Sequence, residues 1–371
     1  MRIDPRRAGR TVAGQRGQVK ATGSLRNQRN AGQVPASFKP QQIAIQAQDM
    51  TATGPSSAAA PLLLDGKATS DAIREQQLKP QCAAFLQRHG RPVGLAVVVV
   101  GARKDSATYV RMKQKACSAA GIESWKIQIA LEQDGAERAE SDVTNELLRT
   151  IKQLNERDDV DGIIVQLPLP AFCDEDAILA TIDPKKDVDG LHPDNHAALF
   201  QFATKKASSQ HEDAPFALPC TPAGCLELLD HYNIPLEGKH VVVLGRSQIV
   251  GLPVSLLCLH RNATVTMCHS RTQDLKARVL EADIVIAAIG RARFVRGDWI
   301  KPGATVIDVG INAVEDASKK SGYRLVGDVD FDAAVKVVHA ITPVPGGIGP
   351  MTVAMLLKNT IQCASRRVRL H

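Results

Sequence analysis

The sequence predicts an α/β protein of two domains, each built on a parallel sheet with helices on both faces. Short, continuous apolar runs such as Val93–Gly101 alternate with helical segments along most of the chain, which is typical of repeated βαβ units. The 371 residues are enough for two cores, since a domain averages about 150 residues. No apolar run reaches the roughly 18 residues that a membrane-spanning helix needs. The eight cysteines are scattered and form no CxxC pair, so we expect reduced, buried thiols and neither a disulfide framework nor a zinc site.

The first series of elements begins at residue 62. Its opening helix should end at Gly90, because Pro92 prevents the helix from resuming. Asp105-Ser106 should cap the next helix and Gly121 should end it. The expected elements are helix 66–89 with an apolar face of Ile73, Leu78, Cys82, Phe85 and Leu86, strand 93–101, helix 105–121, strand 125–130, helix 137–157 and strand 160–166.

A second series follows the polar stretch 203–214. Its expected elements are helix 222–232, strand 240–245, helix 251–261, strands 263–268, 283–288, 304–309 and 325–328, and a long helix from about residue 350. We therefore assign a first domain to 62–210, with the C-terminal helix 350–371 packing back on it. A Rossmann-type domain takes 211–349, and the active site is expected in the cleft between the two.

The positive charge of the chain is concentrated in its first 60 residues. They hold nine of the 46 Lys and Arg residues and two of the 39 acidic residues, so the remaining 311 residues carry 37 of each sign. A neutral globular part argues against nucleic-acid binding. We interpret 1–61 as a disordered basic extension and expect a cytoplasmic protein, because the apolar residues of the extension form no helical stripe. A mitochondrial transit peptide and a start at Met50 remain the alternatives.

A glycine turn indicates a dinucleotide site. The apolar strand 240–245 ends in Gly245-Arg246-Ser247, and Gly251 opens the following helix. Glycine lets the backbone approach a phosphate, and the helix N-terminus favours its charge. The spacing is Gly-x5-Gly rather than GxGxxG, so a plain strand–turn–helix is the alternative.

The residues after strand 263–268 bear on the cofactor. Ser270 and Arg271 stand where an acid would hold the ribose 2′-hydroxyl of NAD. A hydroxyl and a guanidinium suit a 2′-phosphate, so the sequence favours NADP, with Arg246 as a second positive partner. The alternative for Arg271 is an ordinary solvated arginine.

A helix, a strand end and a turn of the first domain carry the candidate catalytic residues. Tyr109 and Lys113 are four apart and share one face of a helix, and Gln166 ends a strand. A lysine can transfer protons if burial or a crowded site lowers its pKa. Asp187 and Asp189 lie in a turn, where they serve either the turn itself or recognition of a bidentate N–H pattern. A surface lysine beside a half-buried tyrosine is the alternative for the first pair.

These segments, in this order, resemble the bifunctional methylenetetrahydrofolate dehydrogenase/cyclohydrolase family over about residues 62–365. The resemblance rests on Ser106-x-x-Tyr109-x-x-x-Lys113, Val165–Pro170, Lys186–Gly190, Pro219–Pro222, Gly245–Ser247, Asp308–Asn312 and Pro345–Pro350. It implies oxidation of 5,10-methylenetetrahydrofolate by hydride transfer to NADP, then hydrolysis of the methenyl cation to 10-formyltetrahydrofolate. It also implies a homodimer formed through the cofactor domain, and no metal.

The resemblance assigns roles to single residues. Lys113 would be the essential group, with Tyr109 as its partner, Gln166 bonded to it, and Asp189 holding the pterin ring. A buried lysine beside a cationic substrate should lose its proton readily. The folate side would be formed by Val165, Leu167, Pro345, Gly346, Gly347, Ile348 and Gly349. The NADP contacts would be Gly245, Arg246, Ser247, Ser270, Arg271 and Ile311.

The chain departs from the family pattern in two loops. Gln248 stands where relatives commonly carry Lys, and Gly290-Arg-Ala-Arg-Phe294 replaces a Gly-x-Pro stretch. Neither change touches Tyr109, Lys113, Gln166 or Asp189. The alternative functions are a folate- or nucleotide-binding protein and a monofunctional dehydrogenase of the same fold.

Overall fold

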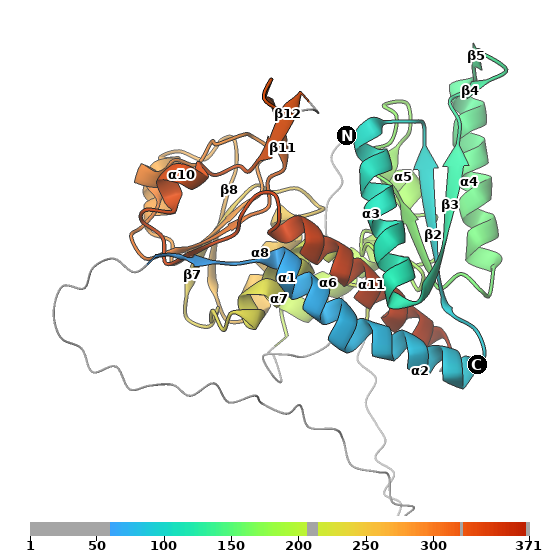
Figure 1. Cartoon of the computed structure of the whole chain (residues 1–371), viewed down its shortest axis with the longest axis horizontal. Coiled ribbons are helices and arrows are strands. Elements are labelled where there is room, and N and C mark those ends of the chain that lie inside the picture. Colours follow the sequence, from blue (N-terminus) through green and yellow to red (C-terminus); the bar gives the residue numbers. More distant parts are fainter. Residues whose placement is uncertain (1–59, 206–213, 320–321, 369–371) are drawn as a thin grey trace, which may run out of the picture. The chain divides into compact units, whose positions relative to one another are not determined.

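The computed structural model describes residues 60–205, 214–319 and 322–368 (Figure 1). The chain divides into two units, Met1–Ser57 and Ala58–His371, and all that follows concerns the second. The expected basic extension lies outside the described residues apart from its last two, as does most of the stretch 203–214. Within the described ranges, no helix is long and apolar enough to cross a membrane.

The smaller of the two main sheets has three parallel strands. β2 (Val93–Val100) lies at its centre, between β3 (Ile122–Ile129) and β6 (Gly162–Val165). All of β2 is buried, because alternate side chains enter two different apolar cores, one on each face of the sheet. Such a strand reads as a continuous apolar run, and the three strand predictions here are confirmed to within a few residues.

Helices cover this sheet on both faces. α3 (Lys104–Ala120) contacts β3, and α4 (Glu140–Glu156) packs on the other face, where its apolar residues join alternate residues of β2. α3 ends at Gly121, which has the predicted left-handed conformation (φ 84°). The predicted cap at Asp105-Ser106 is wrong: α3 begins at Lys104, after Arg103, which makes no side-chain cap.

The opening helix is continuous but changes its winding. α1 (Gly66–Ile73) runs into a π-helical segment, Arg74–Leu78, and then into α2 (Lys79–His89), which ends at Gly90. Four of the five residues predicted for its apolar face are buried, but Leu86 is 48% exposed. That prediction is wrong because Leu86 lies about 100° around the helix from the buried Phe85.

The larger sheet has six parallel strands. In spatial order they are β1 (Leu62–Leu63), β13 (Ala340–Ile341), β10 (Thr305–Asp308), β9 (Ile284–Ala287), β7 (His240–Leu244) and β8 (Thr264–Cys268). The parallel pairing and the helix α8 (Gly251–His260) between β7 and β8 confirm the predicted βαβ character. The expected strand 325–328 lies outside this sheet: β12 (Tyr323–Val326) forms an antiparallel ribbon with β11 (Asn312–Glu315). In Figure 1 this ribbon stands out from the sheet.

Sequence patterns missed several short elements. They are β4 (Glu132–Gln133) and β5 (Ala136–Glu137), which form a hairpin before α4, α5 (Glu175–Leu179), α6 (Pro193–Ala203), α9 (Leu275–Leu280), a 3-10 turn at Gly297–Trp299, and α10 (Phe331–Ala334).

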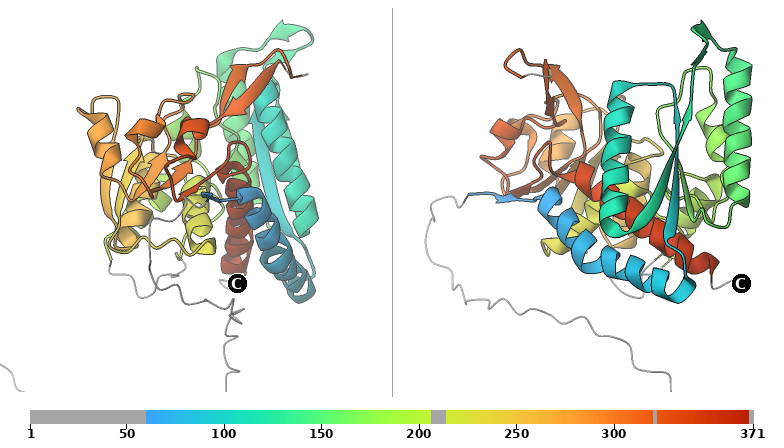
Figure 2. Two further views of the ribbon diagram at one scale, coloured as in Figure 1. Left: turned by 60° about the vertical axis from the view of Figure 1, so that its left-hand side comes forward. Right: turned by 45° about the vertical axis from the view of Figure 1, so that its right-hand side comes forward.

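The C-terminal helix joins the two series of elements. α11 (Ile348–Arg367) contacts α1, β2 and β6, and it also packs along α7 (Cys220–His231). Figures 1 and 2 show α11 (red) running alongside the rod formed by α1 and α2 (blue).

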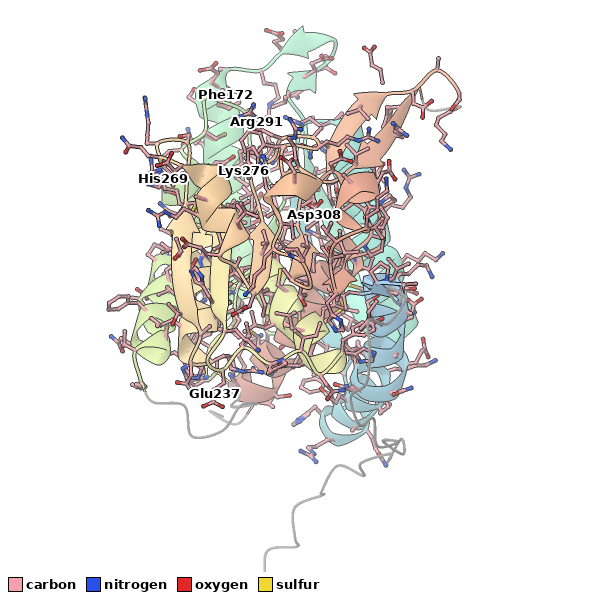
Figure 3. All side chains as sticks on the ribbon, turned by 90° about the vertical axis from the view of Figure 1, so that its left-hand side faces the viewer. Phe172, Glu237, His269, Lys276, Arg291 and Asp308 are labelled. Carbon is pink, nitrogen blue, oxygen red and sulfur yellow. The ribbon has the colours of Figure 1, made fainter. Side chains whose placement is uncertain are left out.

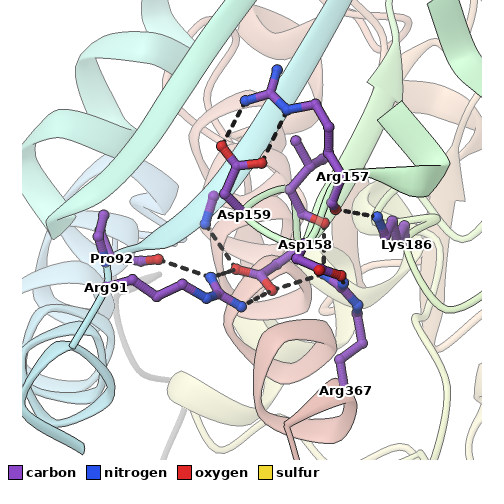
Figure 4. A network of polar contacts seen from close by, with 10 residues as sticks. Arg91, Pro92, Arg157, Asp158, Asp159, Lys186 and Arg367 are labelled. Atoms are coloured by element: carbon purple, nitrogen blue, oxygen red, sulfur yellow. Dashed lines mark hydrogen bonds and ion pairs between the residues drawn. The ribbon is translucent and has the colours of Figure 1, made fainter. Parts of the chain in front are cut away.

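A buried carboxylate fastens the end of α11. Asp161, fully buried just before β6, accepts two hydrogen bonds from Arg91 (2.7 and 2.8 Å) and one from Arg367 (3.0 Å). Figure 4 shows Arg91 and Arg367 in this network of polar contacts. Bidentate, charge-assisted bonds of this kind are among the stronger ones in proteins, so the last turn of the helix is held against the smaller sheet.

All eight cysteines are buried and free, which confirms the predicted reduced thiols. Burial raises the pKa of Cys258 to about 12, and it raises the pKa of Cys117 and of Cys363 to about 12 as well. An unfolded chain ionises its thiols near pH 8.5. The folded state therefore keeps protons that the unfolded state loses, so stability falls as the pH rises from about 8.5 towards 12.

We predict that Cys258→Ala weakens this alkaline loss. Between pH 8 and pH 10, the free energy of unfolding of the variant should fall by about 2 kcal/mol less than that of the unchanged chain. Urea unfolding with a reducing agent at both pH values measures the difference. Leu257→Ala removes a buried apolar neighbour and should leave the pH dependence unchanged. An equal pH dependence for Cys258→Ala and the unchanged chain would contradict the argument.

Candidate active site

The structure brings Lys113 and Gln166 together from separate elements. Lys113 lies on α3 and Gln166 directly follows β6, and Lys113 Nζ donates to Gln166 Oε1 at 3.0 Å. The other end of the amide is also fixed, because Gln166 Nε2 donates to the carbonyl of Leu167 (2.8 Å). The amide oxygen is therefore presented to the lysine. A surface lysine, the alternative interpretation, does not fit this contact with the end of a buried strand.

The turn that contains Asp189 is held by buried polar groups. Lys186 is 2% exposed and its ammonium donates to the carbonyls of Leu154, Asn155 and Arg157 (2.7–3.0 Å), at the end of α4. Burial lowers the pKa of Lys186 to about 8.

The two aspartates of this turn have different surroundings. Asp187 is buried and accepts hydrogen bonds from the backbone N–H groups of Gly190 (3.0 Å) and His192 (2.7 Å) and from Asn195 (2.8 Å). Asp187 therefore serves the turn. Burial raises the pKa of Asp189, and the charge of Lys113 opposes the rise. Asp189 is therefore close enough to Lys113 for the lysine charge to act on its pKa.

A cavity of about 800 Å³ is lined on one side by α3, the helix that carries Lys113, although Lys113, Gln166 and Asp189 are not among its lining residues. Tyr109 lines it one helical turn before Lys113 and is 37% exposed. The volume falls within the range of small-molecule sites. The cavity is lined by Arg103, Thr108, Tyr109 and Met112 from α3, by Asp308–Ile311, Ala313, Tyr323 and Leu325, and by Pro343–Pro350 and Val353.

The predicted site residues divide around the cavity. Its lining includes Tyr109, Ile311 and the five predicted folate-side residues Pro345, Gly346, Gly347, Ile348 and Gly349. Val165 is buried in the core at 2% exposure, and Leu167 is half-buried beside Gln166. Sequence reasoning missed Met112 and Tyr323, and it gave no role to Asp308 or to its neighbour Asp328. The sequence signal for Asp308 is an acidic residue at the end of an apolar strand.

The glycine turn forms a bare backbone cradle at the carboxyl end of β7. Gly245 has φ 123°, and a Cβ there would overlap the carbonyl oxygen of Ala288. A Cβ on Gly251 would overlap the carbonyl oxygen of Gly245. Ser247 Oγ accepts from the N–H groups of Val250 (3.1 Å) and Gly251 (3.4 Å), which fixes the entry to α8. Only glycine permits this close approach, and such a cradle fits a dinucleotide phosphate.

The predicted cofactor residues lie at one end of the larger sheet. Gly245 N donates to the carbonyl of Cys268 (2.9 Å), which joins the glycine turn to the end of β8. Ser270 and Arg271 follow directly and are exposed, as is Arg246. Figure 3 shows His269 and Asp308 towards this end of the sheet and Glu237 at the opposite end. Ligands of open α/β sheets bind at the carboxyl ends of the strands.

A lysine–amide pair at a strand end, a cavity of small-molecule size and a glycine cradle on a parallel sheet together indicate a two-domain α/β enzyme that uses a dinucleotide. Residues 64–189 match the family described as "Tetrahydrofolate dehydrogenase/cyclohydrolase, catalytic domain", and residues 219–368 match its NAD(P)-binding domain. The chain belongs to this family, which confirms the resemblance seen in the sequence.

Individual relatives agree. The chain is 52% identical to Bifunctional protein FolD 2 of Arabidopsis thaliana over 82% of this chain and 95% of that protein. It is 48% identical to Bifunctional protein FolD 4, chloroplastic, of the same plant, over 82% of this chain and 79% of that protein.

Solved structures give the same result. The bifunctional FolD enzyme of Campylobacter jejuni has a TM-score of 0.73 and 44% identity, over 83% of this chain and all of that one. The FolD enzyme of Trypanosoma brucei, described as complexed with NADP cofactor and inhibitor, has a TM-score of 0.75 and 42% identity, over 84% of this chain and all of that one. The chain is thus a bifunctional methylenetetrahydrofolate dehydrogenase and methenyltetrahydrofolate cyclohydrolase with NADP as cofactor.

We predict that Gly245→Ala weakens NADP binding by about tenfold or more. The added carbon would overlap the carbonyl of Ala288, so the cradle must move, and a cost of about 1.4 kcal/mol is a tenfold loss in affinity. Titration calorimetry with NADP measures the change. Gly303→Ala is the matched control: Gly303 also has a positive φ (81°), but no atom lies within 4 Å of the added carbon. If both variants bind NADP like the unchanged chain, the cradle is not the phosphate site.

Proposed function

We propose that Lys113 is the group on which both reactions of this bifunctional enzyme depend. The observation that carries the proposal is the 3.0 Å contact between Lys113 Nζ and Gln166 Oε1, with Asp189 electrostatically coupled to the same lysine. The fixed amide holds Nζ in one place beside the cavity. In the hydrolysis, the amine takes a proton from the water that attacks the methenyl carbon.

The neighbours of Lys113 have supporting roles in this proposal. Asp189 holds the pterin ring through a bidentate pattern of N–H donors, as suits a carboxylate. Tyr109, which lines the cavity one helical turn before Lys113, covers the bound substrate. The folate lies along Leu167 and the segment Pro345–Gly349, while Val165, which the sequence also suggested, is buried in the core and does not reach it.

We predict that Lys113→Met lowers cyclohydrolase activity by about 10²- to 10⁴-fold, which is the rate factor that a proton-transfer group usually contributes. Dehydrogenase activity should fall as well. The substitution keeps most of the stem volume, so the protein should stay folded by circular dichroism. Decay of methenyltetrahydrofolate absorbance measures the hydrolysis.

Lys115→Met is the matched control, since Lys115 is exposed on the same helix two residues away. It should keep both activities. Near-normal hydrolysis by Lys113→Met would show that Lys113 is a bystander.

The cofactor contacts follow from the cradle. NADP would be held by Gly245, Arg246, Ser247, Ser270, Arg271 and Ile311, with Arg246, Ser270 and Arg271 at the 2′-phosphate. When bound, NADP accepts the hydride from the substrate. Ile311 lines the cavity and is 40% exposed, which supports its place between cofactor and folate.

We predict that Arg271→Ala lowers kcat/KM for NADP by about ten- to a hundredfold, because a guanidinium–phosphate contact contributes about 1.5–3 kcal/mol. The kcat/KM for NAD should not fall. Rates must be measured without inorganic phosphate, which could occupy the 2′ site. Arg278→Ala, at an exposed ion pair with Glu281, should change neither value. Equal kcat/KM for NADP and NAD in the unchanged chain would refute the assignment of the 2′-phosphate site.

We also propose the domain boundaries 62–210 and 211–349 and a homodimer formed through the cofactor domain. The contacts of α11 with β2 and β6 support the return of the last helix to the first domain. Exposed Leu252 and Leu259 on α8, next to the open edge of β8, support the dimer face. Sedimentation of the chain in solution measures this assembly.

The proposed location is the cytoplasm, with no nucleic-acid or membrane partner. Eight free, buried thiols suit a reducing compartment. A mitochondrial location is the alternative if residues 1–60 act as a transit peptide, and the relative FolD 4 is named as chloroplastic.

We predict that the chain, tagged at its C-terminus, is recovered in the cytosol when cells are fractionated. Enrichment in an organelle, with a mature N-terminus mapped between about residues 20 and 60, would overturn the cytoplasmic proposal and make the extension a cleaved targeting segment. A cytosolic N-terminus at Met50 or Thr51 would show that translation begins there.

A further inference from the structure

Two carboxylates are buried together at the carboxyl end of the larger sheet. Asp308, the last residue of β10, is 4% exposed, and Asp328, two residues beyond β12, is fully buried. Among the described residues, neither carboxylate has an ion-pair partner. Burying a charge without a counter-ion is costly unless many hydrogen bonds compensate.

The compensation comes almost entirely from backbone N–H groups. Asp308 accepts from Gly310 (2.9 Å), Asp328 (2.9 Å) and Val329 (2.8 Å). Asp308 thereby joins the loop after β10 to the segment after β12.

Asp328 bonds a different loop, the one after β9. It accepts from three successive backbone N–H groups, those of Ile289 (2.6 Å), Gly290 (2.9 Å) and Arg291 (2.9 Å), and from the side chain of Asn312 (2.9 Å). The loop after β9 is therefore fastened to the first residue of β11 through one carboxylate.

Two glycines are required by this arrangement. A Cβ on Gly310 would overlap the carboxylate of Asp328, and a Cβ on Gly327 would overlap that of Asp308. The loops thus close directly on the two carboxylates, with no space for other side chains.

The loops that the pair holds face the site. The loop after β10 lines the cavity through Asp308–Ile311, and the loop after β9 is adjacent to the glycine cradle, where Ala288 approaches Gly245. We propose that Asp308 and Asp328 are positioning residues that set the loops after β9 and β10 for the nicotinamide end of NADP. The inference rests on the proposed seating of NADP at this end of the sheet.

Replacing Asp328 with Asn tests the proposal. Asparagine carries an N–H₂ donor in place of one of the two carboxylate oxygens. This donor faces backbone N–H groups, which are also donors, so those groups lose their acceptor. In the full-length chain, Asp328→Asn should raise the Kd and the KM for NADP by about tenfold or more. Hydrolysis of methenyltetrahydrofolate, measured without NADP, should fall much less than the dehydrogenase kcat/KM.

Two further variants keep the result decisive. Asn312→Ala removes one donor to Asp328 at a half-buried position and should raise the KM for NADP severalfold. If Asp328→Asn does not fold, this variant alone tests the positioning role. Asp161→Asn disrupts a fully buried carboxylate in the other sheet and should lower the melting temperature while leaving the KM for NADP unchanged.

The outcomes separate the two proposals. If the unchanged chain binds NADP and both Asp328→Asn and Asn312→Ala bind it equally well, the positioning role is wrong. If these variants lose both activities in parallel, the pair is only structural and the proposal is again overturned. If the unchanged chain itself fails to bind NADP, the proposed cofactor seat is wrong.

Discussion

The packing of α11 is the constraint on which the site depends. The helix lies against β2 and β6 on one side and along α7 on another. Near its middle, the buried Asn359 donates to the carbonyls of Val188 and Leu218, both at 2.8 Å. Val188 directly precedes Asp189, so the same helix fixes the turn that presents this carboxylate. Just before its first turn, the segment Pro343–Gly347 lines the cavity. One helix therefore sets both the wall of the cavity and the position of an acid beside it.

The opening helix holds that wall from behind. Lys67 N donates to the carbonyl of Gly346 at 2.9 Å, and Gly66 lies so close that a Cβ would overlap the carbonyl of Gly347. β1, just before this helix, pairs with β13, which immediately precedes the same loop. Residues from the start and the end of the described chain thus close on one glycine-rich segment. Glycine is needed there because the backbones approach more closely than side chains would allow.

Much of this could be predicted from the sequence. The continuous apolar runs of β2 and β7 identify buried parallel strands, and Gly90 and Gly121 mark helix ends through their left-handed conformation. The pairing of Tyr109 with Lys113 follows from helical spacing and the place of Gln166 from a strand end, whereas the family resemblance supplied the link between Gln166 and Lys113. Residue patterns alone did not distinguish the two aspartates of the turn. The resemblance singled out Asp189, and the structure shows that Asp187 accepts hydrogen bonds from the turn itself.

What escaped prediction has a physical reason. The opening helix changes its winding in the π-helical segment Arg74–Leu78, and no residue pattern in the sequence marks that change. The pairing of β1 with β13 joins residues 62–63 to 340–341, and no local pattern records such a contact. The partners of Asp328 are backbone N–H groups of a loop 37 to 39 residues earlier in the chain. Since every residue except proline carries such a group, the identities of the partners leave no signal.

The two halves of the site are held by different means, and the difference follows from what each must bind. In the first half of the site, buried charged side chains hold the turn that carries Asp189: Lys186 donates to three carbonyls at the end of α4, and Asp187 accepts from the N–H groups of Gly190 and His192. The amide of Gln166 holds Lys113 Nζ, and the proposed proton transfer depends on such ångström-level geometry. On the cofactor side, bare glycine backbone forms the cradle and buried carboxylates hold the loops by their N–H groups. A phosphate chain needs close approach and free backbone donors, so the carboxylates are kept behind the loops, where their negative charge is compensated before it can oppose the ligand.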